Sequence, residues 1–329
     1  MNSACAVNAI EQHLATRRAA GLFDFSFMNL VEIAGPASLE FLARLQTRSL
    51  ARLDAGRVVY TLLLNDDGSV FIDATLWRIS GERWWLFTGR RSDIAFIEAR
   101  ASEFDVNVRG RSNTFAVLAL QGPASGRILA SAVGVENVQN LRYFRFAETR
   151  FGTIDCIVGR LAYSGELGYE ILVPIADAIS IRNALVDRGV VECDFDVANS
   201  LRIESGFVLF DREITGRENP FELRLDHLVE LDGRDFLGKD AFIALRRAPP
   251  ERRLVGLEIG DRAASHFLPR AHVTSECDSP IFRRRIALGF AAPSLSDGSL
   301  VRLDDGRLAR TARLPFYDAS RRLARAAPL

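Results

Sequence analysis

The segment from Tyr163 to Glu170, YSGELGYE, places two carboxylates and two tyrosines around two glycines, and the apolar run ILVP follows it directly. Glycines this close together are typical of a turn, and tyrosines beside a turn commonly pack against its flanks. The alternative interpretation is that the acids and tyrosines contact a ligand. Other segments of the chain are needed to decide between a packed turn and a ligand site.

A second segment also contains residues that could do chemistry. It reads VVYTLLLNDDGSVFIDATLWRI and has the pattern of two strands joined at Asn65-Asp-Asp-Gly68. If Asn65 faces Gly68 across a two-residue turn, Tyr60 lies directly opposite Asp73 on one face of the hairpin. Aspartate is depleted in strands and is costly to bury without a partner. Either this face is solvated and Asp73 is harmless, or the pair forms a wall suited to a flat, nitrogen-rich ligand.

The usual catalytic and cofactor motifs are absent from the sequence. The chain contains no GxGxxG after a strand-like run, no GxxxxGK[ST], no HExxH and no GxSxG. Its four histidines do not have metal-ligand spacing. The sequence therefore gives no support to a bound metal, a nicotinamide cofactor or serine hydrolysis.

Composition narrows the class of protein further. The 329 residues are 48% hydrophobic and 26% charged, with 42 basic and 42 acidic side chains, so no net field attracts nucleic acid or an anionic membrane. No apolar run approaches the roughly 20 residues that span a bilayer. The cysteines are far apart, without a CxxC pair, at Cys5, Cys156, Cys193 and Cys277. We expect a soluble cytoplasmic protein with reduced thiols.

A weak internal repeat organises the first half of the chain. VEIAGPASLEFLARL (Val31 to Leu45) is echoed by VLALQGPASGRILAS (Val117 to Ser131), each with the pattern of a strand, Gly-Pro-Ala-Ser and a helix. We expect Pro36 and Pro123 just inside the start of each helix. From about Arg252 the chain changes to short alternating runs separated by Asp-Gly turns, which predicts a small separate β domain.

Seven segments, in this order and spacing, resemble the aminomethyltransferase (T-protein) family of the glycine cleavage system. Similarity runs along nearly the whole chain. The segments are AGLFDFSFM (20–28), YTLLLNDDGSVFID (60–73), LALQGP (118–123), YSGELGYEILVP (163–174), LRIESGFVLFDREITGRENPFE (201–222), DFLGKDAF (235–242) and LPFYD (314–318).

The resemblance implies an α+β fold with three domains arranged as a cloverleaf around a central folate cavity. On this basis, residues 1–29 and 115–250 form a mixed α/β domain that carries folate-pocket residues. Residues 30–114 form a second α/β domain with the Tyr60/Asp73 hairpin. Residues 251–329 form a small C-terminal β-barrel.

The same resemblance assigns roles to five residues. Tyr163 and Glu170 match the family positions that line the pterin pocket, where a carboxylate suits the pterin's amino edge. Arg202 matches the pocket arginine, whose guanidinium orients folate or pairs with a pocket acid. Tyr60 and Asp73 match the family's hairpin residues. Asp73 is the expected catalytic residue, since it would assist proton transfer or stabilise a cationic intermediate.

The resemblance implies transfer of a one-carbon unit to tetrahydrofolate from an aminomethyl group on a lipoyl carrier. Two departures leave the donor open, because Phe27 replaces a family histidine and the acid pair of the hairpin is reduced to Asp73-Ala74. A small-molecule N-, O- or S-methyl donor is therefore a second possibility. The alternatives to a transferase are a non-catalytic folate-binding protein of the iron–sulfur-maintenance type and an interaction subunit of an oxidase or demethylase complex.

Overall fold

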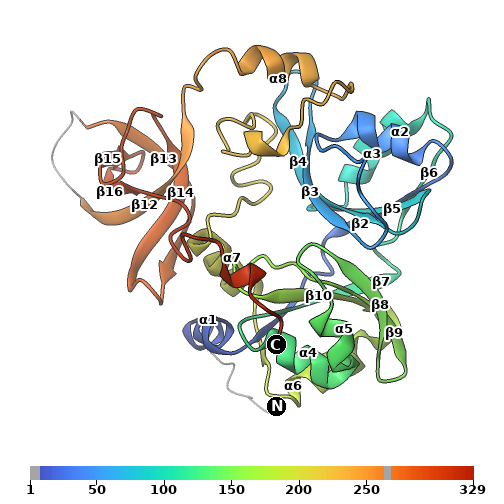
Figure 1. Ribbon diagram of the computed structural model, residues 1–329. Helices are drawn as coiled ribbons and strands as arrows, with labels where there is room; N and C mark the ends of the chain where they lie inside the picture. The colour runs from blue at the N-terminus through green and yellow to red at the C-terminus, as the bar shows by residue number, and fades with distance from the viewer. Residues whose placement is uncertain (1–7, 263–267) are drawn as a thin grey trace.

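The computed structural model describes residues 8–262 and 268–329, so Cys5 lies outside the described residues. Two mixed sheets and a five-stranded barrel form three bodies, which Figure 1 shows around the helix α7 (Phe195–Glu204). The mixed α/β architecture predicted from the sequence is confirmed. No helix among the described residues is long and apolar enough to cross a membrane.

The first sheet has six strands in the order β11-β1-β7-β10-β9-β8. Helices α4 (Ser125–Val133) and α6 (Ala178–Val186) cover its outer face, where Leu129, Ile181 and Leu185 pack on the sheet. Helix α1 (Ala9–Arg18) precedes the sheet, and the short α5 (Val135–Gln139) follows α4. The strands are β1 (Gly21–Asp24), β7 (Phe115–Gln121), β8 (Phe146–Phe151), β9 (Ile154–Gly159), β10 (Gly168–Pro174) and β11 (Val191–Glu192).

The second sheet has five strands in the order β3-β4-β5-β2-β6. Helices α2 (Ser38–Leu45) and α3 (Asp93–Ala101) cover its outer face through apolar side chains such as Phe41 and Ile97. The strands are β2 (Asn29–Ala34), β3 (Val58–Leu64), β4 (Val70–Arg78), β5 (Arg83–Thr88) and β6 (Asn107–Gly110).

The internal repeat corresponds to two equivalent strand-turn-helix units, β2–α2 and β7–α4. Gly35 and Gly122 turn the chain at equivalent places and have nearly the same positive φ, 136° and 131°. Glycine is required at both, because an added Cβ would lie 2.6 Å and 2.5 Å from a backbone oxygen. Pro36 and Pro123 lie in these turns before the helices, not inside them as predicted, since the helices begin only at the following serines, Ser38 and Ser125.

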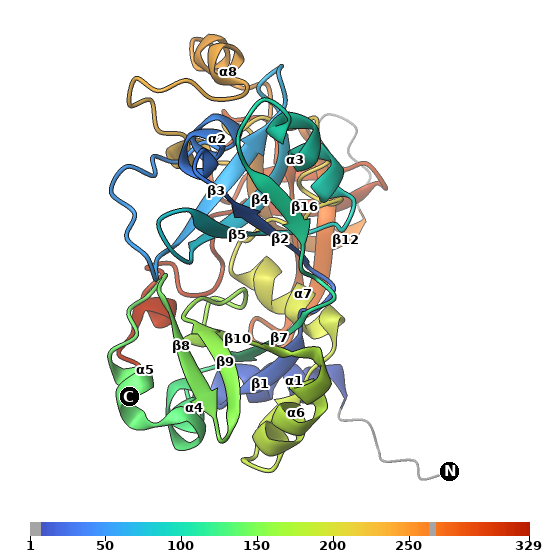
Figure 2. The same ribbon diagram turned by 90° about the vertical axis from the view of Figure 1, so that its right-hand side faces the viewer.

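The inner faces of the two sheets pack on each other. Trp77 and Phe87 from the second sheet share one core with Ala119 and Leu172 from the first, and Leu201 of α7 joins it. Helices therefore cover the outer faces, and the inner faces form a common interface (Figure 2). Side chains on these inner faces come from distant parts of the chain and meet there.

The C-terminal part follows α8 (Lys239–Leu245) and contains strands that pair in a closed ring, β12-β14-β13-β15-β16. One end of α7 contacts this ring, because Arg202 hydrogen-bonds Ser275 of β13. The strands are β12 (Arg253–Arg262), β13 (Arg270–Ser279), β14 (Arg284–Ala291), β15 (Leu300–Leu303) and β16 (Arg307–Ala312). Three short 3₁₀ helices complete the described chain, at Ile175–Asp177, Asp226–Leu228 and Leu323–Arg325.

Candidate functional site

The register of the β3–β4 hairpin differs from the predicted one. Tyr60 pairs with Thr75, and Asp73 pairs with Leu62, so Tyr60 and Asp73 are not directly opposite each other. The turn has three residues, since the amide of Asn65 donates to the Ser69 carbonyl at 2.9 Å. Such loops commonly end in a glycine with positive φ, here Gly68 at 80°.

A bulge then adds a second shift of one residue between Leu63 and Leu64, where Phe71 of β4 has no partner in the ladder. One shift alone would turn Asp73 to the opposite face of the sheet, whereas two shifts restore the face. Tyr60 and Asp73 therefore remain on the inner face as diagonal neighbours. The predicted shared face is correct and the predicted direct opposition is wrong.

Tyr60 and Asp73 form a hydrogen-bonded pair, in which the Tyr60 hydroxyl donates to Asp73 Oδ2 at 2.8 Å. Burial raises the pKa of Asp73 to about 6, although the Tyr60 hydrogen bond lowers it. Burial, together with the Asp73 charge, also raises the pKa of Tyr60 well above its usual value. Asp73 thus gains or loses a proton near neutral pH, while Tyr60 remains a hydrogen-bond donor.

Tyr163 lies close to this pair and is held at both ends. Its hydroxyl donates to the Val208 carbonyl at 2.6 Å, and its backbone amide donates to Gln121 Oε1 at 3.2 Å. Burial raises the pKa of Tyr163, an effect that the charge of Asp73 reinforces and that of Arg202 opposes. The tyrosine hydroxyl is therefore already used within the protein, and one side of the ring stacks on Phe207 with the centroids 6.0 Å apart.

Arg17 of α1 anchors the loop that carries Tyr163. Its Nη1 donates to the Ser164 carbonyl at 2.8 Å and to Glu166 Oε1 at 2.9 Å, while its Nη2 donates to Glu204 Oε2 at 2.7 Å. The guanidinium also stacks on the Tyr317 ring, 3.8 Å from the centroid. Glu166, the first acid of the YSGELGYE segment, therefore positions the loop and does not line the inner face.

Glu170 lies on the inner face of the first sheet, beside Ala119 of β7 and Gly159 of β9 in the ladder. The Trp77 ring of the second sheet packs against Gly159, where an added Cβ would lie 2.1 Å from it. Glu170 is 7% exposed, and burial alone raises its pKa to about 8. No side chain within residues 8–262 and 268–329 donates a hydrogen bond to this carboxylate or forms an ion pair with it.

This burial predicts an unusual pH dependence of stability. The folded pKa of Glu170 is raised, so between the ordinary value of 4.5 and about 8 the folded protein holds a proton that the unfolded chain has lost. Stability therefore falls as pH rises through this window.

We expect Glu170→Gln to melt at a higher temperature than the wild type at pH 8.5 and at a similar temperature at pH 4. A Glu148→Gln control, at an exposed position of β8, should show no such pH-dependent gain. Equal melting of Glu170→Gln and wild type at pH 8.5 would contradict the burial of an unpartnered acid.

Arg202 is fully buried and is committed to partners within the protein. Its Nη1 donates to Glu213 Oε2 at 2.7 Å and to the Phe207 carbonyl at 3.0 Å, while Nε and Nη2 donate to Asn199 and Ser275. Of the two predicted roles for Arg202, pairing with an acid is the one present in the structure. Contact with folate stays a prediction.

The structure brings four of the five predicted residues into one electrostatic neighbourhood, because Tyr163 is influenced by both Asp73 and Arg202, and Tyr60 by Tyr163. Glu170 lies on the facing sheet of the same interface. This arrangement offers one acid that titrates near pH 6, one buried acid without a partner, and two aromatic rings. Among the described residues, no group of acids, histidines and cysteines has the geometry of a metal site.

Sequence reasoning missed three residues that position the site, namely Arg17, Gln121 and Glu213. A signal for Gln121 existed in the internal repeat, where this polar residue stands in the position of Ala34. Its side-chain oxygen accepts hydrogen bonds from the amides of Tyr163 and Ser164. Arg17 gave no local signal, because its partners are distant in sequence, and Glu213 pairs with Arg202 across an irregular loop in which no helical or strand spacing predicts the contact.

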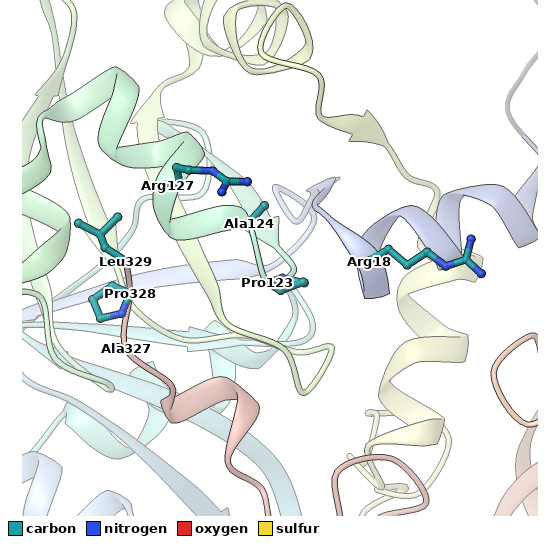
Figure 3. Close-up of a pocket in the computed structure, with 7 residues that line it drawn as sticks. All are labelled: Arg18, Pro123, Ala124, Arg127, Ala327, Pro328 and Leu329. Carbon is teal, nitrogen blue, oxygen red and sulfur yellow. The ribbon is translucent and has the colours of Figure 1, made fainter.

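A hollow of about 420 Å³ lies elsewhere, between the start of α4 and the last residues of the chain (Figure 3). Arg18, Arg127 and Pro328 line it, and none of the five predicted residues does. We do not connect this hollow with the candidate site.

Comparison with known proteins shows the family to which the chain belongs. Residues 3–233 match the family described as the GCVT N-terminal domain. The chain therefore belongs to this family, the aminomethyltransferase family of the glycine cleavage system, and the predicted resemblance is confirmed.

Individual relatives agree with this assignment. The chain is 32% identical to an aminomethyltransferase of Symbiobacterium thermophilum, over 96% of this chain and 91% of the relative. It is also 32% identical to a probable aminomethyltransferase of Natronomonas pharaonis, over 93% and 90%. Among solved structures, the glycine cleavage system aminomethyltransferase T from Bartonella henselae matches with a TM-score of 0.84 and 29% identity, over 94% of this chain and 90% of that one. The chain is an aminomethyltransferase-like transferase enzyme. None of these relatives supports the folate-binding or interaction-subunit alternative.

Proposed function

We propose that the protein transfers a one-carbon unit from an aminomethyl donor to tetrahydrofolate. The observation that carries this proposal is Glu170, a carboxylate that is 7% exposed and has no partner within the described part of the chain. An unpaired buried acid is costly, so a natural structure retains one where a ligand supplies the missing donors. The amino edge of a reduced pterin offers such donors to the two carboxylate oxygens.

The other side chains suit the remainder of such a ligand. Tyr60 and Tyr163 provide aromatic surfaces beside Asp73, and apolar residues of both sheets exclude water from the interface. When bound, reduced folate supplies the nucleophilic amine that accepts the carbon, so the protein needs no nucleophile of its own. This agrees with the absence of a nucleophile motif in the sequence.

Asp73 is the group placed to hold or move a proton in this site. Its pKa of about 6 lets the carboxylate accept a proton near neutral pH and release it again. Tyr60 orients the carboxylate and stabilises its ionised form through the 2.8 Å hydrogen bond. Arg202 acts through Glu213, since its hydrogen bonds hold α7 to the loop that carries Val208, the partner of Tyr163.

Glu170→Ala tests this proposal. Removing the hydrogen bonding between this carboxyl group and the pterin edge, worth roughly 1.5–3 kcal/mol in total, should weaken tetrahydrofolate binding by about tenfold to a few hundredfold. Isothermal titration calorimetry measures the change. Glu148→Ala, which removes an exposed acid from the same sheet, should bind with wild-type affinity. Failure of the wild type to bind any reduced folate at millimolar concentration would overturn the proposal.

The structure constrains the identity of the one-carbon donor less than that of the acceptor. Relatives named aminomethyltransferase, one of them for the glycine cleavage system, support an aminomethyl group on a carrier protein. Phe27 has ring contacts with Phe25, Phe195 and Phe210 and is 40% exposed, so an aromatic surface stands where the family has a histidine. We propose the carrier-borne aminomethyl group as the donor, and a screen of methylated small molecules for single-turnover transfer tests the alternative.

A further inference from the structure

Arg90, in the loop between β5 and α3, donates hydrogen bonds to three separate segments. Its Nε donates to Asp93 Oδ1 at 2.9 Å, its Nη1 to Asp211 Oδ1 at 3.1 Å and its Nη2 to the Phe71 carbonyl at 3.3 Å. Its backbone amide also donates to Asp93 Oδ2, at 3.0 Å. The guanidinium therefore ties the start of α3 and the segment after α7 to strand β4.

The Phe71 carbonyl belongs to the bulge that sets the face of Asp73. Phe71 has no ladder partner in β3, and the described pairing of β4 with β5 begins only at Thr75 and Phe87. A strand carbonyl outside the ladder needs a donor from elsewhere, and Arg90 supplies it just after the end of β5. Because a slip of one residue would turn Asp73 to the outer face, this hydrogen bond supports the direction in which the acid points.

An aromatic stack packs against the same bulge. The Phe71 ring lies 3.9 Å from the Phe96 ring of α3, and the two planes are nearly parallel at 8°. A cation covers each end of the stack, with Arg90 Cζ 5.2 Å from the Phe71 centroid and Arg100 Cζ 3.4 Å from the Phe96 centroid. Arg100 donates to the Phe96 carbonyl and not to the bulge, so it shares only the packing role of Arg90.

Arg90 and Asp93 also act on the charge of Asp73. Burial is the largest influence on the pKa of Asp73 and raises it, whereas the Tyr60 hydrogen bond lowers it. Beyond these, the Asp93 carboxylate raises this pKa and the Arg90 cation lowers it. From the facing side, Tyr163 interacts with the Asp73 charge. The side chain of Asp93 is 1% exposed, so loss of Arg90 alone would leave a buried carboxylate unbalanced next to Asp73.

We propose that Arg90 is a positioning residue for Asp73, because it holds the bulge of β4 in place and balances the charge of Asp93. The inference rests on the proposed function, since it assigns a support to the proton-handling acid of the same site. Arg90 acts through Asp73 and not on the ligand. Its removal should therefore change the transfer rate and its pH dependence more than the folate affinity.

Arg90→Met tests this role with two measurements. In protein labelled with ¹³C at the aspartate side-chain carboxyl, NMR should show Asp73 titrating about 0.5–1 pH unit higher than in the wild type. The spectrum of Asp73→Asn identifies the signal. The single-turnover rate above this midpoint should fall about tenfold, since a small displacement of the acid misaligns proton transfer. Tetrahydrofolate affinity, measured by calorimetry, should change by less than about threefold.

Three further variants separate charge, hydrogen bonding and packing. Arg90→Met/Asp93→Asn removes both charges, so the Asp73 midpoint should return towards the wild-type value while transfer stays slow. Arg90→Lys keeps the charge and the midpoint, but one ammonium cannot span the acceptors that the guanidinium joins, so the rate should be intermediate. Arg100→Met disturbs only the far end of the stack and should keep the wild-type midpoint and rate. Circular dichroism melts verify that each variant folds.

The outcomes separate this inference from the proposed function. If Arg90→Met keeps the wild-type titration of Asp73 and the wild-type rate, while Asp73→Asn is slow, the positioning role is wrong and the proposed function stands. Equal slowing by Arg90→Met and Arg100→Met without a change of midpoint would also overturn it, because packing would then explain both. If Arg90→Met does not fold, a wild-type rate in Arg90→Lys contradicts the role and an intermediate rate supports it. If the wild type transfers no carbon to tetrahydrofolate, the proposed function fails, and the NMR titration still decides whether Arg90 controls Asp73.

Discussion

Asp73→Asn should transfer the one-carbon unit roughly a hundredfold more slowly than the wild type in a single turnover, or more slowly still. The substitution keeps the shape of the side chain and its position next to Tyr60, but it removes the negative charge and the ability to accept a proton. Tetrahydrofolate affinity should change by less than about tenfold, because the pterin edge is assigned to Glu170. Rapid-quench measurement of bound complex separates the transfer step from binding.

The pH profile supplies an independent check on this role. Since the pKa of Asp73 is raised to about 6, the wild-type rate should rise as pH increases through 6 and then level off, whereas Asp73→Asn should show no such step. Tyr60→Phe removes a hydrogen bond that lowers this pKa, so its midpoint should move upward. Transfer by Asp73→Asn at the wild-type rate would show that the assigned mechanism is wrong, even with the fold and ligand correct.

Arg202→Met should lower the free energy of unfolding by about 3–5 kcal/mol, because it leaves the fully buried Glu213 carboxylate without its charge partner. The same change removes hydrogen bonds from α7 to the Phe207 carbonyl and to Ser275 of the barrel. We therefore expect a large decrease in the urea midpoint. Folate affinity should fall as well, as the segment carrying Val208 no longer holds Tyr163.

The double variant Arg202→Met/Glu213→Gln distinguishes loss of the ion pair from loss of packing. Neutralising Glu213 removes the unpaired buried charge, so part of the lost stability should return. A double variant as unstable as the sum of both single variants would show that the pair has no coupling. Wild-type stability of Arg202→Met would contradict the burial seen for this pair.

Local sequence determined much of the architecture and marked the candidate site residues. The repeated strand, Gly-Pro-Ala-Ser and helix pattern specified two related units, because each carries its own turn and apolar periodicity. The alternation after Arg252 specified a run of strands, although two of these, β12 and β13, are longer than the predicted short runs. The segments around Tyr60, Asp73, Tyr163, Glu170 and Arg202 marked the family that the comparisons confirm.

Only the tertiary structure decided how these residues face one another. The register of the β3–β4 hairpin depends on a three-residue turn and on a bulge at Phe71, and a bulge leaves no reliable signature in a single strand. The acidic partners of Arg17 lie in distant segments, and Arg202 pairs with Glu213 across the loop that follows α7, so no helical or strand spacing revealed these contacts. The burial of Glu170 without a partner also depends on the tertiary structure. Burial is a property of two packed surfaces and not of one strand, so the strand sequence alone does not predict it.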